Sequence, residues 1–559
     1  MKKWQIIEKL KTGEPKLKTD EIVAILLKNR GLKTKREIEE FLNPPKPQTL
    51  TPKLAGIKTD QFAKAVGRIK RAIVQKQSII VYSDYDADGV CGAAILWETL
   101  NKLGAKVMPY IPHRVEEGYG LSHKGIDFIK KEYDAKLIIT VDHGIGSLEK
   151  INYAKKQGIE VIVTDHHIVP ERLPAAYAIV HTLSLCGAGV VWVLAQALGL
   201  KRENQNSDFL DLVAIATIAD MVPLTGANRI LVKYGLEELN QTKRIGLKAL
   251  IAEVGCQRGK IGVYEIGHIL APRLNAMGRM EHAMDSLRLL CTRDSQRASN
   301  LARHLDQTNR ARQELMKQTL DHAKSSNQLT SQSIGKLIFI HHESYQQGVI
   351  GLVAGKLVEE FYRPAIVIWR GETFSKASAR SINGFNIIEA IRKTQDLLVD
   401  AGGHPMAAGF TVETRNLEIL QKRLTEIAEK ELDEEKLTRV LKIDCEVGLE
   451  DLNFELYGNI AEFSPFGLGN PEPVFATRGV IVKDVRAVGS NGRHLKLLIT
   501  HNSSPTTISA VAFGFGKLFP QLSPETPIDV AYTLSVDEWN GENRLELKIR
   551  DIKIFKQDQ

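Results

Sequence analysis

Short apolar runs alternate with amphipathic segments between about residues 60 and 220. The runs are SIIVYSD (78–84), KVMPYIP (106–112), KLIITVDHG (136–144) and EVIVTDHH (160–167). Each begins with β-branched or aromatic residues and is short enough to be a buried strand, while the segments between them have helical spacing. This alternation predicts an α/β fold with a mainly parallel sheet and helices on its faces.

The rest of the chain has different patterns on either side of a long helical segment. Residues 1–50 contain helical fragments and end in the proline-rich linker NPPKPQTL, and residues 51–295 hold the α/β pattern. Residues 296–327 contain no Gly or Pro and space leucines at a helical period, which predicts one long connecting helix. A second α/β pattern covers residues 328–435, and residues 436–559 show short alternating strands typical of a small β-barrel.

Composition restricts the class of protein only broadly. The chain has 559 residues, of which 43% are hydrophobic and 25% charged, so we expect several globular domains. No apolar run is long enough for a membrane span, and we expect no signal peptide. The five cysteines are scattered singly, which is typical of a protein of the reducing cytoplasm. A net charge of +8 is compatible with a nucleic-acid partner.

The first strand is followed by three carboxylates at alternate positions, Asp84, Asp86 and Asp88, and then by Gly89. This resembles the start of a calcium loop, but the twelfth position, which needs a bidentate glutamate, is Ile95. An EF-hand loop also follows a helix, whereas this one follows a strand. We therefore expect a divalent cation of another kind at the carboxyl end of a strand, where α/β sheets bind ligands.

The next two strands end in similar residues. Asp142 and His143 follow one strand, Asp165, His166 and His167 follow the other, and Asp220 ends the apolar run LVAIATIAD. Carboxylates mixed with imidazole favour manganese or magnesium over a thiolate zinc site. The number of ligands predicts two ions, the arrangement that cleaves phosphoanhydride or phosphodiester bonds.

These motifs resemble a known family. DYDADG, VDHG, TDHH and ATIADMVPL match in order and spacing the motifs of the DHH phosphoesterase superfamily, and the long helix, SARSI, GGHPMAAG and FGLGNPEPVF resemble its RecJ family. The resemblance implies a DHH catalytic domain, a DHH-associated domain and a C-terminal OB-fold in residues 51–295, 328–435 and 436–559. His143 departs from the family pattern, in which Cys or Asn is usual, and could perturb the neighbouring metal.

The resemblance also implies roles for single residues. His167 is expected to contact the scissile phosphate, Asp165 to orient the histidines, and Asp142 to bridge two Mn²⁺ or Mg²⁺ ions. The implied metal ligands are Asp84, Asp86, Asp88, Asp142, His166 and Asp220, and the implied catalytic residues are Asp142, His166 and His167.

Substrate contacts are expected in several separate segments. Arg114 and Tyr119 in HRVEEGYG, with Ser378 and Arg380 in KASARSI, are implied to capture a 5′ end. Arg279 is a further candidate for a phosphate contact, and His404 lies among glycines that let backbone approach a strand of nucleic acid. Candidate contacts on the barrel are Arg493, His494, Lys496, Trp539 and Arg544.

The resemblance implies a metal-dependent exonuclease that degrades single-stranded DNA from 5′ to 3′, releasing 5′ mononucleotides, in recombination and repair. A cytoplasmic monomer that works with a helicase and a single-strand-binding protein is expected. Two alternatives stay open. One is a DHH phosphodiesterase of short oligonucleotides, cyclic dinucleotides or pyrophosphate, and the other is a non-catalytic single-strand-DNA-binding assembly factor.

Overall fold

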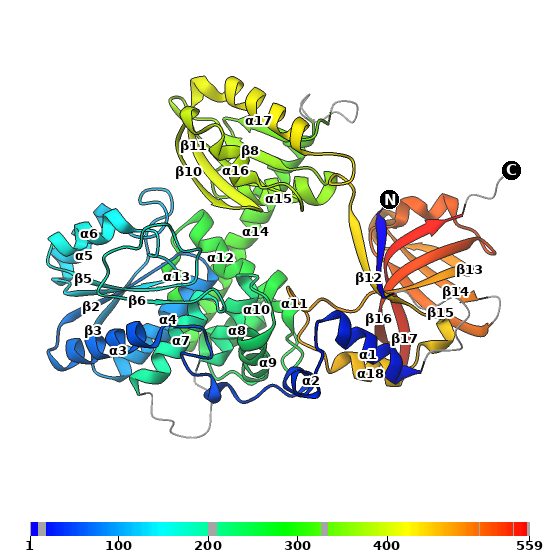
Figure 1. Cartoon of the computed structure of the whole chain (residues 1–559), viewed down its shortest axis with the longest axis horizontal. Helices are drawn as coiled ribbons and strands as arrows, with labels where there is room; N and C mark the ends of the chain where they lie inside the picture. Colours follow the sequence, from blue (N-terminus) through cyan, green and yellow to red (C-terminus); the bar gives the residue numbers. More distant parts are fainter. Residues whose placement is uncertain are drawn as a thin grey trace. The chain divides into compact units, whose positions relative to one another are not determined.

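The computed structural model describes residues 2–8, 18–199, 209–325, 334–501, 504–539 and 542–555. The chain divides into two compact units (Figure 1). One unit comprises residues 45–437 and 467–469, and the other comprises residues 1–44, 438–466 and 470–559. No described helix is both long enough and apolar enough to cross a lipid bilayer.

The larger unit begins with a five-stranded parallel sheet in the order β3-β2-β4-β5-β6. Its strands are β2 (Ser78–Ser83), β3 (Lys106–Tyr110), β4 (Leu137–Val141), β5 (Glu160–Asp165) and β6 (Ala178–His181). All of them run in one direction, so their carboxyl ends meet at one edge of the sheet. The expected sheet is confirmed, and its edge gathers the acidic strand ends.

Helices cover both faces of this sheet (Figure 1). One face packs on α3 (Thr59–Val74), α4 (Ala87–Lys102) and α7 (Gly187–Leu198), and the other on α5 (His123–Tyr133) and α6 (Leu148–Lys156). Successive residues of β2 therefore enter different cores: Ile79 and Val81 lie in the first, Ile80 and Tyr82 in the second. Burial on both faces explains why the strand reads as a continuous apolar run.

A helical layer follows the sheet and packs beside α4. Its members are α8 (Leu210–Ala219), α9 (Gly226–Asn240), α10 (Ile245–Glu253), α11 (Val263–Glu265), a π-helical turn (Ile266–Leu270), α12 (Ala271–Met280) and α13 (Met284–Cys291). The expected long helix follows as α14 (Ser295–Ser325). The last two positions predicted for it, 326 and 327, lie outside the described residues.

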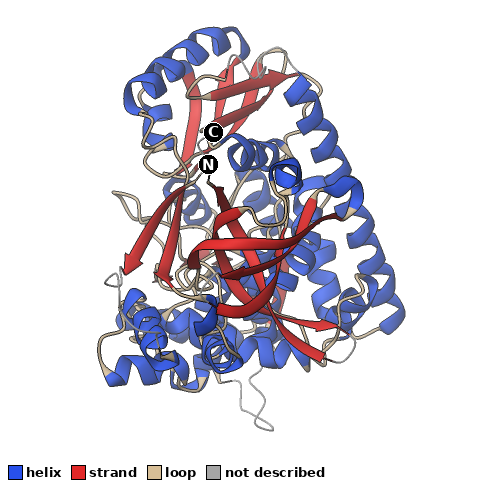
Figure 2. Ribbon diagram, turned by 90° about the vertical axis from the view of Figure 1, so that its right-hand side faces the viewer, coloured by secondary structure: helices blue, strands red, loops and turns tan. Residues whose placement is uncertain are grey.

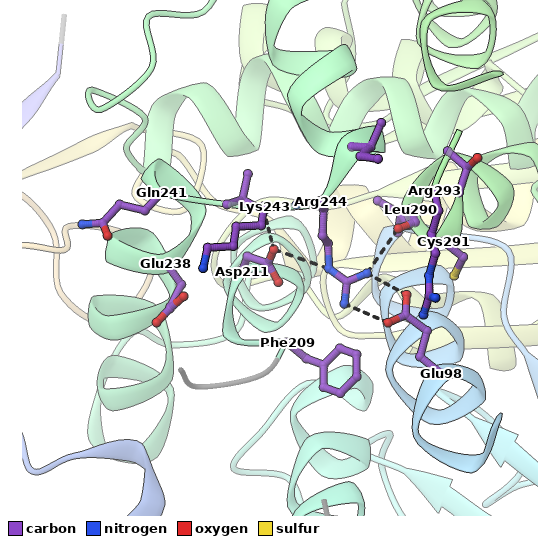
Figure 3. Close-up of a pocket in the computed structure, with 13 residues that line it drawn as sticks. Glu98, Phe209, Asp211, Glu238, Gln241, Lys243, Arg244, Leu290, Cys291 and Arg293 are labelled. Atoms are coloured by element: carbon purple, nitrogen blue, oxygen red, sulfur yellow. Dashed lines mark hydrogen bonds and ion pairs between the residues drawn. The ribbon is translucent and has the colours of Figure 1, made fainter. Parts of the chain in front are cut away.

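A largely buried arginine joins α4 to three helices of this layer at the wall of a cavity of about 430 Å³ (Figure 3). Arg244, before α10, donates to both carboxylate oxygens of Glu98 on α4 and to the carbonyl of Leu290 on α13. Its Nε lies 3.4 Å from Asp211 at the start of α8. The ring of Phe209 lies 5.2 Å from the guanidinium carbon. Arg244 therefore fixes one end of α4 and of α8, whose other ends bear Asp88 and Asp220.

Arg244→Met is expected to lower the free energy of unfolding by about 3 kcal/mol, because it leaves two largely buried carboxylates without their cation. The change is measured as a lower Tm. Arg293→Met is the matched control, since Arg293 lines the same cavity but is exposed and has no ion pair within the described part of the chain. Equal Tm values for the two variants would contradict the bracing role of Arg244.

The second α/β part of the larger unit contains a mixed sheet in the order β10-β11-β9-β8-β7. Its strands are β7 (Ile338–His342), β8 (Ala365–Trp369), β9 (Phe374–Arg380), β10 (Leu398–His404) and β11 (Ala407–Glu413), and its helices are α15 (Ile350–Phe361), α16 (Ile387–Arg392) and α17 (Leu417–Glu431). The glycine-rich motif GGHPMAAG forms the hairpin between β10 and β11. Gly409 in β11 pairs with Ser378 in β9, which places the glycines beside the SARSI motif.

The smaller unit contains a closed five-stranded barrel, and Figure 2 draws its strands in red like all other strands of the chain. They are β13 (Phe475–Val488), β14 (His494–His501), β15 (Ser504–Ala512), β16 (Pro527–Trp539) and β17 (Glu542–Ile554). β13 pairs with both β14 and β16, and β15 pairs parallel with β17, so no edge of the barrel sheet stays open. This is the arrangement of an OB-fold, and with the two α/β parts it confirms the predicted fold class.

The beginning of the chain folds with the barrel. α1 (Thr19–Asn29) and α2 (Lys35–Leu42) confirm the expected helical fragments, and α18 (Phe454–Ala461) packs against α1. Residues 3–8, for which the sequence predicted no strand, form β1 (Lys3–Glu8), which pairs parallel with β12 (Val440–Glu446). A six-residue run has too little periodicity to reveal a strand whose partner lies over 430 residues away in sequence.

Candidate metal centre and nucleic-acid site

Two aspartates directly follow neighbouring strands at the carboxyl edge of the sheet. Asp84 follows β2 and donates its backbone N–H to the carbonyl of Val141, while Asp142 follows β4 and donates to that of Thr164. Asp142 has a φ of 67°, which turns the chain sharply as the strand ends. Both side chains are buried. These backbone hydrogen bonds to the neighbouring strands fix the positions of both carboxylates.

Asp86 and Asp88 are held by helix ends. Asp86 is the N-cap of α4 and accepts from the backbone N–H groups of Asp88 and Gly89. The carboxylate of Asp88 accepts from the N–H groups of Gly187 at 2.6 Å and Ala188 at 2.7 Å, at the start of α7. The positive end of the α7 dipole therefore faces Asp88 and stabilises its charge.

His166 lies at the centre of the cluster. Its Nε2 is 3.0 Å from Asp142 Oδ1, 3.5 Å from Asp220 Oδ2 and 3.8 Å from Asp88 Oδ2. Asp220 is the C-cap of α8, so a helix end brings the fourth acidic motif to the sheet edge. Three overlapping groups have ligand atoms within 4.8 Å of one another: Asp88, His166 and Asp220; Asp84, Asp86 and Asp142; and Asp142, His166 and His167. All six predicted metal ligands lie in these groups.

The donor atoms of this cluster fit divalent cations. Asp84 Oδ1, Asp142 Oδ1, His166 Nε2 and Asp220 Oδ2 are buried, and none has a hydrogen-bond partner among the described residues. Burial and the nearby Asp88 carboxylate raise the pKa of Asp220 to about 9, and burial and neighbouring carboxylates also raise the pKa of Asp84 and of Asp142. Buried carboxyl groups of this kind are ionised at neutral pH only if a nearby cation offsets their charge. Oxygen atoms with one imidazole nitrogen suit manganese or magnesium.

Asp165 orients both histidines. One of its oxygens accepts from the backbone N–H of His166 at 2.7 Å and of His167 at 3.1 Å, and lies 2.8 Å from His167 Nδ1. The other accepts from the N–H of Ile145. Although burial opposes it, the hydrogen bond with His167 holds the pKa of Asp165 below its usual range. Asp165 thus fixes the ring of His167 with Nε2 toward the hydroxyl of Tyr119, 3.4 Å away.

His143, which departs from the expected motif, does not join the cluster. Its Nε2 lies 2.9 Å from the carbonyl of Tyr82, so it donates to the backbone of β2. Burial lowers the pKa of His143 to about 4, which keeps the ring neutral. Within the described residues, none of the three ligand groups includes His143.

Gly187, Ala188 and Asn275 belong to the site but were not singled out in the sequence. Asn275 Oδ1 accepts from the backbone N–H of Ala87 at the start of α4. The signal for Gly187 is the run CGAG at the start of an apolar helix, since small residues allow a helix end to approach closely. No comparable signal marks Asn275, whose partner is almost 190 residues away.

Gly187→Ala is expected to reduce metal binding, because a Cβ at this position would lie 2.6 Å from Asp142 Cβ and 2.9 Å from its Cα. We expect the apparent Kd for Mn²⁺ to rise at least about 10-fold, the usual size of the effect when support of a metal ligand is lost. Calorimetric titration with Mn²⁺ measures it. Gly67→Ala in α3 is the matched control, since a Cβ there meets no atom within 4 Å. Unchanged Mn²⁺ affinity in Gly187→Ala would contradict the close-approach argument.

A cavity of about 780 Å³ adjoins the cluster. Its lining includes His167 and all six predicted substrate-binding residues: Arg114, Tyr119, Arg279, Ser378, Arg380 and His404. They come from the loop after β3, from α12, from β9 and from the end of β10, so four separate segments meet here. Because of its three guanidinium groups we call it the arginine cavity.

The arginine cavity has an excess of positive charge. Arg114 lies over the ring of Tyr85 at 4.8 Å, and Arg380 donates to the carbonyl of Ala379. Neither Arg114 nor Arg279 has an ion pair within the described chain. Burial first, and then the like charge of Arg114, lower the pKa of Arg279 to about 10. Converging guanidinium groups without acidic partners favour binding of a phosphate.

The predicted barrel contacts have less distinctive surroundings. Lys496 lies 3.8 Å from Asp537 and 3.6 Å from Glu546, so its charge already faces two carboxylates. His494 accepts from the N–H of Gly514 and packs edge-on against Phe513. Arg493 and Arg544 are exposed, and the side chain of Trp539 lies outside the described part of the structure.

Comparison with known proteins gives consistent matches along the chain. The family models "DHH family, N-terminal domain", "DHHA1 domain" and "RecJ OB domain" match residues 78–217, 332–430 and 443–551. The single-stranded-DNA-specific exonuclease RecJ of Bacillus subtilis (strain 168) is 39% identical over 98% of this chain, which covers 70% of that protein.

Two solved structures also match almost the whole of this chain. The crystal structure of RecJ from Thermus thermophilus in complex with Mn²⁺ is 29% identical, with a TM-score of 0.83, and the match covers 99% of this chain and 79% of that one. The structure of RecJ from the same organism in complex with Mg²⁺ is 28% identical, with a TM-score of 0.76, over 99% and 78% of the two chains. The parallel sheet, the second α/β part and the OB-fold barrel each fall within a range matched by one of these family models, and the chain belongs to the RecJ family.

Proposed function

We propose that the protein is a metal-dependent exonuclease that degrades single-stranded DNA from 5′ to 3′ and releases 5′ mononucleotides. The observation that supports this most directly is the meeting of two features at His167. On one side lies a cluster of unpartnered carboxylate and imidazole atoms, and on the other the arginine cavity. A family relative that is named a single-stranded-DNA-specific exonuclease supports the substrate class.

The residues proposed to hold two divalent cations, Mn²⁺ or Mg²⁺, are Asp84, Asp86, Asp88, Asp142, His166 and Asp220. Asp142 shares one group with Asp84 and another with His166, which makes it the candidate for a ligand to both ions. When bound, such ions lower the pKa of a water nucleophile and offset the charge on the phosphorus oxygens.

The chain's own side chains orient the scissile phosphate. Asp165 accepts a hydrogen bond from His167 Nδ1, which leaves Nε2 available toward the phosphate. The hydroxyl of Tyr119 donates to the carbonyl of Asp142 and so ties its loop to the metal cluster. His166 and His167 therefore serve different roles, the first as a ligand and the second as a phosphate contact.

Polarity is proposed to come from the arginine cavity. Arg114, Arg380 and Ser378 would hold a terminal 5′ phosphate, with Arg279 as a further contact and Tyr119 beside the first nucleotide. Since the cavity begins at His167, a strand anchored there presents its first phosphodiester bond to the metal cluster. His404 and the glycines of β10 and β11 would form the wall along which the strand lies.

The domains have separate proposed tasks. Residues 51–295 form the DHH catalytic domain, joined by α14 to a DHH-associated domain at 328–435. Residues 1–50 form an N-terminal segment, and residues 436–559 an OB-fold that binds single strands. We place the protein in the cytoplasm as a monomer that acts in DNA recombination and repair, with a helicase and a single-strand-binding protein as partners.

The test is digestion of a 3′-labelled, 5′-phosphorylated single strand with Mn²⁺, with Mg²⁺ or with chelator, beside its duplex and a dinucleotide. Progressive shortening of the single strand from its 5′ end, only with metal, is the expected result. Cleavage of the dinucleotide alone would instead assign a phosphodiesterase of short oligonucleotides. Binding without any cleavage would assign a non-catalytic assembly factor.

A further inference from the structure

A second cavity, of about 840 Å³, lies against the same histidine. It shares Tyr119, His167, Gly403 and His404 with the arginine cavity. The rings of His167 and His404 are stacked, with centroids 6.2 Å apart and an angle of 18° between their planes. The histidine pair is therefore common to the walls of both cavities, and we call the second one the apolar cavity.

The lining of the apolar cavity differs in chemistry from that of its neighbour. Ile168 and Val169, directly after His167, are 61% and 44% exposed, and Pro170, Ile388 and Pro405 add further apolar surface. Arg392 is the one guanidinium or ammonium group among the described residues that line it, and Glu171 and Glu389 line it too. A largely apolar lining with two glutamates beside one arginine does not favour binding of a phosphate.

The apolar cavity also has uncharged groups that can form hydrogen bonds with a ligand. Asn386 accepts from the backbone N–H of Glu389, and its Nδ2 has no partner within the described residues. The hydroxyl of Ser147 does not cap α6, and Gly144 and Gly146 line the cavity with it. Apolar surface with a few hydrogen-bonding groups is what the faces and edges of a nucleobase require.

We propose that the apolar cavity receives the nucleobase of the 5′-terminal nucleotide while its 5′ phosphate occupies the arginine cavity. This inference rests on the proposed function and specifies how its substrate is held. Phosphate and base of one nucleotide would lie on the two sides of the histidine pair, with the scissile bond beside His167. The bound base would then cover the exposed side chains of Ile168 and Val169.

The test compares two 5′-phosphorylated single strands, one with an ordinary 5′-terminal nucleotide and one with an abasic residue there. For the wild-type chain we expect kcat/KM of the first cleavage to fall about 10-fold on the abasic end, the usual effect of one lost base contact. A strand with the abasic residue about ten nucleotides downstream controls for general flexibility and should be cut at the ordinary rate.

Ile168→Ser assigns the effect to this cavity. It should lower kcat/KM about 10-fold on the ordinary strand and leave the abasic-ended strand unchanged, since the contact is already missing there. Leu173→Ser is the matched control, because Leu173 is exposed on the same loop but does not line the cavity. Binding of the two strands in chelator, followed by fluorescence anisotropy, should show the same pattern without any cleavage.

Each outcome decides the inference. Equal cleavage and equal binding of ordinary and abasic ends would overturn it, and so would a loss in Ile168→Ser that is the same on both strands. If no strand is cut with either metal, the proposed function fails. The anisotropy pattern still tests the base site in that case.

Discussion

Asp142→Asn is expected to abolish hydrolysis while leaving single-strand binding within about 3-fold of wild type. Asp142 lies in two of the three ligand groups, and its Oδ1 is 3.0 Å from His166. A metal ion stabilises developing charge by several kcal/mol, and about 1.4 kcal/mol is tenfold in rate, so we expect a loss of at least about 1,000-fold in kcat. Steady-state digestion of the labelled strand measures it.

The same variant separates loss of metal from loss of fold. In chelator its Tm should be at least that of wild type, because the substitution removes one of several crowded carboxylates. Mn²⁺ should raise the Tm of wild type but not that of Asp142→Asn. Asp321→Asn, an exposed aspartate on α14, is the matched control and should behave as wild type. Near wild-type turnover in Asp142→Asn would exclude Asp142 as a ligand.

Arg114→Ala should weaken the preference for a 5′-phosphorylated end. A charge-assisted hydrogen bond contributes about 1.5 to 3 kcal/mol, so we expect kcat/KM on the 5′-phosphorylated strand to fall about 10- to 100-fold. On a 5′-hydroxyl strand the fall should be below about 3-fold, since no terminal phosphate is present. Rates on the two strands, measured side by side, give the ratio.

Two companions assign that effect to the arginine cavity. Arg380→Ala should shift the ratio in the same direction, because Arg380 lines the cavity with Arg114. Arg258→Ala removes an exposed arginine that does not line the cavity and should leave the ratio unchanged. An unaltered ratio in both Arg114→Ala and Arg380→Ala would mean that another group recognises the 5′ end.

Local pattern was sufficient where the chemistry follows a strand directly. Asp84, Asp142, Asp165 and His166 each lie at or just beyond the end of a short, mainly apolar strand, and parallel strands place their carboxyl ends together. The expectation that these residues share one edge could therefore be made before any coordinates. The OB-fold could be expected in the same way, from short alternating strands and turns.

Contacts between segments far apart in the sequence could not be predicted from local pattern. The anchoring of Asp88 by the N–H groups of Gly187 and Ala188 depends on α7 beginning against α4, about 100 residues away in sequence. The role of Arg244 between Glu98 and Asp211 likewise depends on four helices that pack together. Backbone donors and buried ion pairs have no periodic signature, so a sequence does not reveal them.

The sequence by itself determined the class of chemistry and the elements that bear it, because strand and helix periods and ligand types are local properties. Only the tertiary structure decided that His143 faces the backbone of Tyr82 rather than the metal cluster, and that β1 joins β12 beside the barrel. It also decided that Arg114, Arg279 and Arg380 line one cavity beside His167. The physical reason is that burial, charge proximity and cavity shape arise from the packing of segments far apart in the chain, and this packing is fixed by the whole fold.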